Sequence, residues 1–105
     1  MNKWRRYEVL LPLQLNDCSK VSEELLGEAA EEVADQFDGS TLEIRGIQGR
    51  WHSEGVLYRD DLIRLVVDVP DTVKNRKWMK KFKARWKERF EQLELWMVSY
   101  RIEVE

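Results

Sequence analysis

The alternation of apolar and polar positions along the chain predicts four strands and two helices. Apolar residues that recur every second position indicate strands, because successive side chains of a strand point to opposite faces. The strands are predicted over 6–13, 41–51, 56–69 and 96–104. Apolar residues spaced three and four positions apart indicate amphipathic helices instead. They are predicted over 22–38 and 73–93, with 92–95 unwinding into the last strand.

Residues that favour helix ends and turns fall at these limits. Ser22 is placed to cap the first helix, and Gly39 follows its last turn as a stop. Pro70 ends the third strand, and either Asp71 or Thr72 is placed to cap the second helix. The elements therefore follow the order strand, helix, strand, strand, helix, strand.

That order favours one fold class in a chain of 105 residues. Its commonest arrangement is the ferredoxin-like βαββαβ sandwich, an α+β fold. Right-handed crossovers then place both helices on one face of a four-stranded antiparallel sheet. We expect a single domain over residues 1–105, with no linker or repeat.

The second predicted helix combines an apolar stripe with a high density of bases. Six residues of one helical face form the stripe, which is typical of a helix that packs on a core. They are Trp78, Met79, Phe82, Trp86, Phe90 and Leu93. Nine lysines and arginines between 74 and 89, half of the 18 in the chain, surround it and are opposed there only by Glu88. The outer face of this helix is therefore predicted to be strongly positive.

The first predicted helix has the opposite charge, with seven acids and no base between 22 and 38. Our preferred interpretation is that the two charged helices complement each other and are otherwise solvated. An acidic protein partner and a nucleic acid are the alternatives for the basic face. If this face binds a partner, the candidate residues are Lys77, Lys80, Lys81 and Arg85. The aromatic stripe is predicted to be core, so it offers no stacking platform for bases.

The face of the sheet away from the helices is a second candidate surface. From the first and third strands we expect it to carry Arg6, Glu8, Leu10, Leu62, Arg64, Val66 and Asp68. We expect Arg101 and Glu103 to join it from an edge strand. Such a face has no aromatic platform for RNA. It suits pairing with the sheet of a second copy, or it is solvated.

The predicted hairpin between the second and third strands contains an alternative ligand site. His52, the single histidine, precedes Tyr58, Arg59 and Asp60 on the facing strand. A histidine near a carboxylate and a tyrosine could act in acid–base chemistry. The chain has no nucleophile motif and no second histidine, so we expect no catalytic residue, no metal site and no cofactor.

Residues of the predicted hairpin also contribute to a resemblance between this chain and a known protein family. The residues that carry it are the first strand from Arg6 to Leu11, the Gly49-x-Trp51 motif, Gly55, and Arg59-Asp60-Asp61 with the apolar strand that follows. Over about half of the chain they resemble a family of small uncharacterised bacterial proteins of unknown function with a ferredoxin-like core. The resemblance implies a fold and transfers no activity, ligand or catalytic residue.

Composition limits the remaining classes of function. No apolar run approaches the roughly 18 residues of a membrane span, and no signal region follows Met1, so we expect a cytoplasmic protein without a membrane partner. One cysteine excludes an internal disulfide. The leading interpretation is a non-catalytic binding or interaction module that forms a homodimer. The alternatives are a small-ligand enzyme or binder of the dimeric α+β-barrel type, and nucleic-acid binding through the basic helix.

Overall fold

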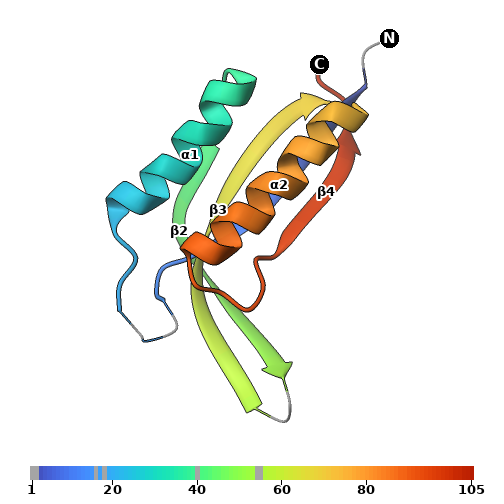
Figure 1. The fold of residues 1–105 in the computed structure, drawn as a ribbon. Coiled ribbons are helices and arrows are strands. Elements are labelled where there is room, and N and C mark those ends of the chain that lie inside the picture. The colour runs from blue at the N-terminus through green and yellow to red at the C-terminus, as the bar shows by residue number, and fades with distance from the viewer. Residues whose placement is uncertain (1–2, 16, 18, 40, 54–55) are drawn as a thin grey trace.

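The computed structural model describes residues 3–15, 17, 19–39, 41–53 and 56–105, apart from the side chains of 42–61. Within these residues two helices pack on a sheet (Figure 1). The elements are β1 (Trp4–Pro12), α1 (Glu23–Phe37), β2 (Thr41–Ser53), β3 (Val56–Pro70), α2 (Val73–Arg89) and β4 (Met97–Ile102). The predicted α+β class, with two helices against an antiparallel sheet, is confirmed.

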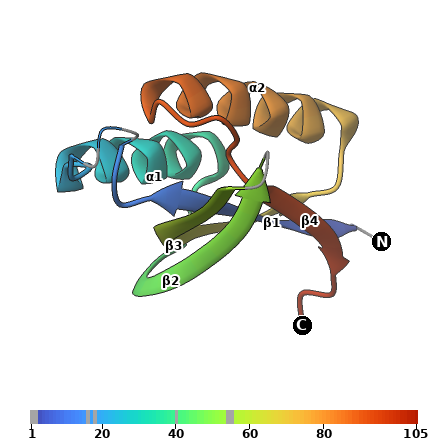
Figure 2. The same ribbon diagram turned by 90° about the horizontal axis from the view of Figure 1, so that it is seen from below.

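The strands form one sheet in the order β2-β3-β1-β4, and every neighbouring pair is antiparallel. Both helices cover the same face of this sheet, and the other face is left open (Figure 2). β2 and β3 extend beyond the rest of the sheet as a long two-stranded arm (Figure 1). The register of this pair shifts between Glu43 and Ile47, the segment that contains Gly46, as at a β-bulge or similar irregularity.

The core lies between the sheet and the helices. The strands contribute Tyr7, Val9, Leu11, Ile63, Leu65, Val67 and Val69, and the helices contribute Leu26, Ala29, Val33, Met79, Phe82 and Trp86. Aromatic rings of α2 follow one another along the helix from Trp78 to Phe90, with centroid separations of 5.3–6.1 Å between successive rings. The aromatic stripe is therefore core, as its spacing predicts.

The residues that cap the starts of both helices were predicted from the sequence, but the residue at which α1 stops was not. The side chains of Ser22 and Thr72 accept hydrogen bonds from the amides of Leu25 and Asn75. At the end of α1, however, Asp38 and not Gly39 takes the left-handed conformation, with φ of 62°. An aspartate tolerates this conformation better than most residues, so the turn is made one position earlier than predicted.

The expected place of Leu93 in the core was wrong, and this changes the face that β4 presents. α2 ends at Arg89 because the chain turns at Glu91, with φ of 53°, so Leu93 is exposed and Leu95 is buried instead. Leu95 and Met97 point inward, and alternation then turns the even positions of β4 outward. Arg101 consequently lies on the helix side of the sheet, not on the open face as predicted. Glu103 follows the end of β4 at Ile102 and is exposed, so it is not part of the open face of the sheet either.

Candidate functional site

The open face of the sheet carries more apolar surface than the sequence indicated. The register of β1 with β3 and β4 brings together Trp4, Leu10, Leu62, Val66, Val98, Tyr100 and Ile102, and Trp96 joins them beside Leu10. Trp96 is 63% exposed and Tyr100 43% exposed. The prediction of a face without aromatic residues was therefore wrong. The inward positions of Leu95 and Met97 turn these aromatics toward the open face.

The charged groups of this open face already have partners on it. Arg6 donates two hydrogen bonds to Asp68, at 2.7 and 2.9 Å, from paired positions of β1 and β3. The bond to Asp68 raises the pKa of Arg6 above its usual value. The Tyr100 hydroxyl donates to Glu8 at 3.3 Å. The face is thus apolar around one ion pair, Arg6 with Asp68, and one hydrogen-bonded carboxylate, Glu8.

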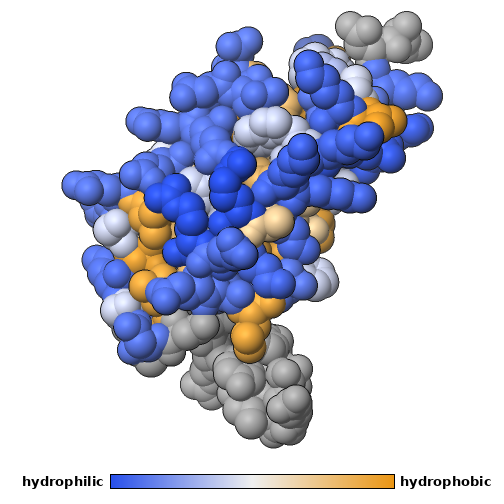
Figure 3. Space-filling model, in the orientation of Figure 1, coloured by the Kyte–Doolittle hydropathy of each residue, from blue (hydrophilic) through white to orange (hydrophobic). Residues whose placement is uncertain are grey.

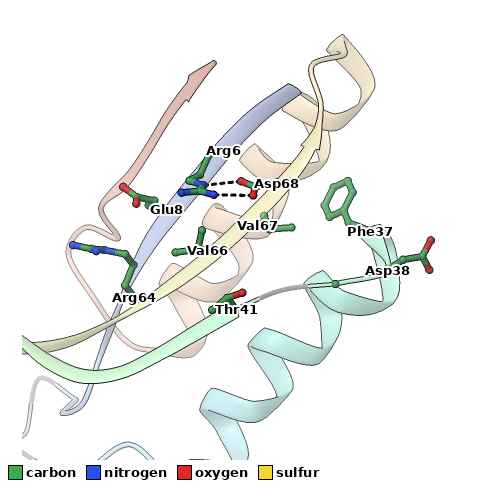
Figure 4. Close-up of a pocket in the computed structure, with 10 residues that line it drawn as sticks. Arg6, Glu8, Phe37, Asp38, Thr41, Arg64, Val66, Val67 and Asp68 are labelled. Carbon is green, nitrogen blue, oxygen red and sulfur yellow. Dashed lines mark hydrogen bonds and ion pairs between the residues drawn. The ribbon is translucent and has the colours of Figure 1, made fainter. Parts of the chain in front are cut away.

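A concavity of about 650 Å³ opens beside the Arg6–Asp68 pair. Its lining residues are Arg6, Glu8, Phe37, Asp38, Gly39, Thr41, Arg64, Val66, Val67 and Asp68. Figure 4 shows Glu8 and Arg64 on one side of β3, and Phe37 and Asp38 on the other, at the end of α1. The pairing of β2 with β3 reaches only as far as Thr41 and Val66, so β2 does not cover the edge of β3 beyond Val66. The concavity lies around this uncovered edge.

The basic helix is partly neutralised by its neighbours. Arg85 pairs with Glu32, and Arg89 pairs with Glu28 at 2.7 Å while its guanidinium lies 4.2 Å from the Trp86 ring. These pairs join α2 to the acidic α1, as expected from their opposite charges. Arg85 is therefore engaged within the chain and is not a free contact for a partner.

The three lysines predicted beside Arg85 lie on the outer side of α2. Lys77, Lys80 and Lys81 are exposed, and among the described residues they have no ion pair. Figure 3 shows a largely hydrophilic surface over both helices, with smaller apolar areas between and beside them. The outer helix surface is consequently charged and hydrated.

The alternative ligand site in the hairpin falls on the projecting arm. The backbone register pairs His52 with Leu57, Trp51 with Tyr58, Arg50 with Arg59 and Gly49 with Asp60. His52 and Tyr58 thus occupy neighbouring and not paired positions. The side chains of these four candidates lie outside the described residues, so the site stays a prediction.

Two further searches bear on the class of function. Among the described residues, no group of three or more histidine, cysteine, aspartate or glutamate side chains is arranged to hold a metal ion. In the same part of the chain neither helix has the length and apolar character needed to cross a membrane.

Comparisons with known proteins identify the fold. No protein-family model matches the sequence, and no curated protein matches it either. Among solved structures, the divalent cation tolerance protein CutA1 of Thermus thermophilus aligns with a TM-score of 0.67 and 16% identity, over 97% of this chain and 86% of that one. CutA1 of Oryza sativa aligns with a TM-score of 0.68 and 12% identity, over 99% and 84% of the two chains.

A phage SAM lyase in complex with S-methyl-5'-thioadenosine is similar as well. It has a TM-score of 0.71 and 9% identity, over 99% of this chain and 92% of that one. At these identities the likeness concerns the fold alone. A resemblance to small ferredoxin-like proteins is thereby supported, whereas the uncharacterised sequence family is not found.

Proposed function

We propose that the protein is a non-catalytic interaction module that forms a homo-oligomer through the open face of its sheet. The observation that carries this proposal is the exposure of Trp96 and Tyr100 on a face where Arg6, Asp68 and Glu8 are already bonded within the chain. Burial of exposed apolar area is favourable by about 25 cal/mol per Å². The usual opposing cost, unpaired buried charge, is reduced when each charge brings its own partner.

The occupant of this face is a second copy of the chain. A two-fold axis places the same patch on both subunits, so apolar strips of β1 and β4 meet each other across the interface. The projecting arm of β2 and β3 supports association, because an isolated two-stranded hairpin is marginally stable in water. Contact with a neighbouring subunit would stabilise such an arm.

The test is the mass of the protein in solution over about a hundredfold range of concentration, by sedimentation velocity. We expect an oligomer in the wild type and a monomer in Trp96→Glu. The matched control is Val73→Glu, which places the same charge at a residue 67% exposed at the start of α2. A wild type that stays monomeric, or two variants that behave alike, would contradict the proposal.

A small-ligand binder is the second candidate, and the concavity beside Thr41 and Asp68 favours it. One structural neighbour is described with S-methyl-5'-thioadenosine bound, so this molecule is a reasonable first probe. Thr41→Arg would fill the mouth of the concavity, and Asp35→Arg, on the exposed side of α1, is the control. A thermal shift with this probe that disappears only in Thr41→Arg would favour the binder over the interaction module.

A further inference from the structure

Three arginines converge on one carboxylate where the start of α2 meets β1 and β4. Asp71 accepts from Arg5 at 3.0 Å, from Arg76 at 3.1 Å and from Arg101 at 3.3 Å. The Asp71 side chain is only 2% exposed, and its backbone amide donates to the Lys3 carbonyl at 2.8 Å. The carboxylate is thus fixed in the floor of the cluster.

The charges of this cluster do not balance. One carboxylate faces three guanidinium groups, and every guanidinium stays charged at physiological pH. Arg5 and Arg101 are also direct register partners on neighbouring strands, an arrangement that is unfavourable for like charges. The first turn of α2 contains no acid, so the positive end of the helix adds to the excess. A local surplus of about two positive charges therefore remains on the described residues.

The unused donors of the cluster lie at the surface. The Arg5 side chain is 17% exposed and also donates to the Ser99 hydroxyl at 3.1 Å, so it is more buried than the other two arginines of the cluster. Arg76 and Arg101 are 50% and 61% exposed. Arg101 donates to Asp71 through Nε alone, and within the described residues both of its terminal nitrogens have no acceptor. Arg76 donates to Asp71 through both Nε and Nη2, at 3.3 and 3.1 Å, and within the described residues its other terminal nitrogen, Nη1, has no acceptor. Both side chains are consequently held in place with donors left toward solvent.

We propose that Arg76 and Arg101, positioned by Asp71 and Arg5, form a binding site for a phosphoryl group. Arginine forks match the geometry of phosphate oxygens and bind them by two parallel hydrogen bonds. A phosphoryl dianion would neutralise the surplus charge and relieve the repulsion between Arg5 and Arg101. The cluster lies on the helix side of the sheet, so this site is independent of self-association through the open face.

The test is an NMR titration of the wild-type protein with inorganic phosphate, in which sodium chloride keeps the ionic strength constant. We expect saturable shifts of the side-chain Nε–Hε signals of Arg76 and Arg101, with a dissociation constant of about 1 mM, which corresponds to a binding free energy of about −4.1 kcal/mol. A parallel titration with phosphoserine distinguishes a phosphoryl group on a larger molecule from the free ion. Shifts that chloride alone reproduces would overturn the proposal.

Three variants separate binding from a purely structural network. Arg101→Gln removes the most exposed fork and is expected to weaken phosphate binding at least about tenfold, a loss of about 1.4 kcal/mol. Arg85→Gln, on the same helix as Arg76 but paired with Glu32, is the control and keeps wild-type affinity. Asp71→Asn removes the carboxylate that positions Arg76 and Arg101, so it is expected to weaken binding as well. Equal affinity in wild type and Arg101→Gln would overturn the proposal even if Asp71→Asn does not fold.

Discussion

The open face of the sheet and the outer face of α2 both combine apolar and charged residues, and they arrange them in opposite ways. On the open face the charges are paired, as in Arg6 with Asp68, while Trp96 remains exposed. On α2 the aromatics are buried, Trp86 completely, and lysines such as Lys80 reach solvent. The same residue types thus leave aromatic surface exposed in one place and charged surface exposed in the other.

The difference shows that charge density alone does not identify a binding surface. A helix with many bases is conspicuous in the sequence, yet two of its arginines are bound by Glu28 and Glu32 of its own neighbour. The open face is less conspicuous because its apolar residues are spread over three strands. Only the assembled sheet brings Trp4, Leu10 and Tyr100 to one side.

The largest expected effect contrasts one tryptophan from each region. Trp86→Ala should lower the free energy of unfolding by about 3–5 kcal/mol, because it leaves a cavity in the core. It also removes the bond from the indole to Glu32, at 3.0 Å. Trp96→Ala, measured at a concentration where the protein is monomeric, should change it by no more than about 0.5 kcal/mol. Urea unfolding of both variants gives the comparison, and similar losses would show that Trp96 is part of the core of a single chain.

Most of the fold could be predicted from local patterns in the sequence. Alternation in β1 and β3, the four-residue spacing in α2 and the capping residues Ser22 and Thr72 each act within a few positions, so they could be recognised without the structure. Which alternate residues of β4 face the core could not be recognised in this way. Leu93 and Leu95 are equally apolar, and which of them enters the core depends on where α2 stops, at Arg89, on the turn at Glu91, and on space left by other elements.

The candidate sites depended still more on contacts between distant residues. Nothing near Asp71 in the sequence indicates that Arg5 and Arg101, 66 and 30 positions away, bind it. The neutralisation of Arg85 by Glu32 likewise requires knowing how α1 lies beside α2. Charge patterns could be counted from the sequence, but which charges are free could not.

The second prediction concerns how the free energy of unfolding changes at acid pH. Hydrogen bonds from Arg5, and then from Arg76, lower the pKa of Asp71 to about 2 against the opposing effect of burial. The unfolded chain therefore binds a proton at this group before the folded one does, as pH falls. Its stabilising contribution is present above about pH 4 and is lost between about pH 4 and about pH 2.

Urea midpoints measured across that range would check this contribution. Asp71→Asn should flatten the slope of the midpoint against pH. The control is Glu94→Gln, because the pKa of Glu94 is also lowered, by its bond from Lys83, but this group is exposed. We expect Glu94→Gln to leave most of the slope in place. An unchanged slope in Asp71→Asn would mean that this carboxylate is not held by the arginines in solution.

The smallest expected effect is on nucleic-acid binding by the outer face of α2. A protein that neutralises phosphates shows a slope of about −0.9 in log affinity against log salt for each contact on duplex DNA. Arg85 and Arg89 are engaged by Glu32 and Glu28, and the whole chain carries a net charge of −2. We therefore expect hardly any binding of labelled DNA or RNA by fluorescence anisotropy at about 200 mM salt, and only weak binding at about 50 mM. Micromolar affinity that survives the higher salt and disappears in the double variant Lys77→Glu/Lys81→Glu would reverse the comparison, because the hydrated face of α2 would then be the functional one.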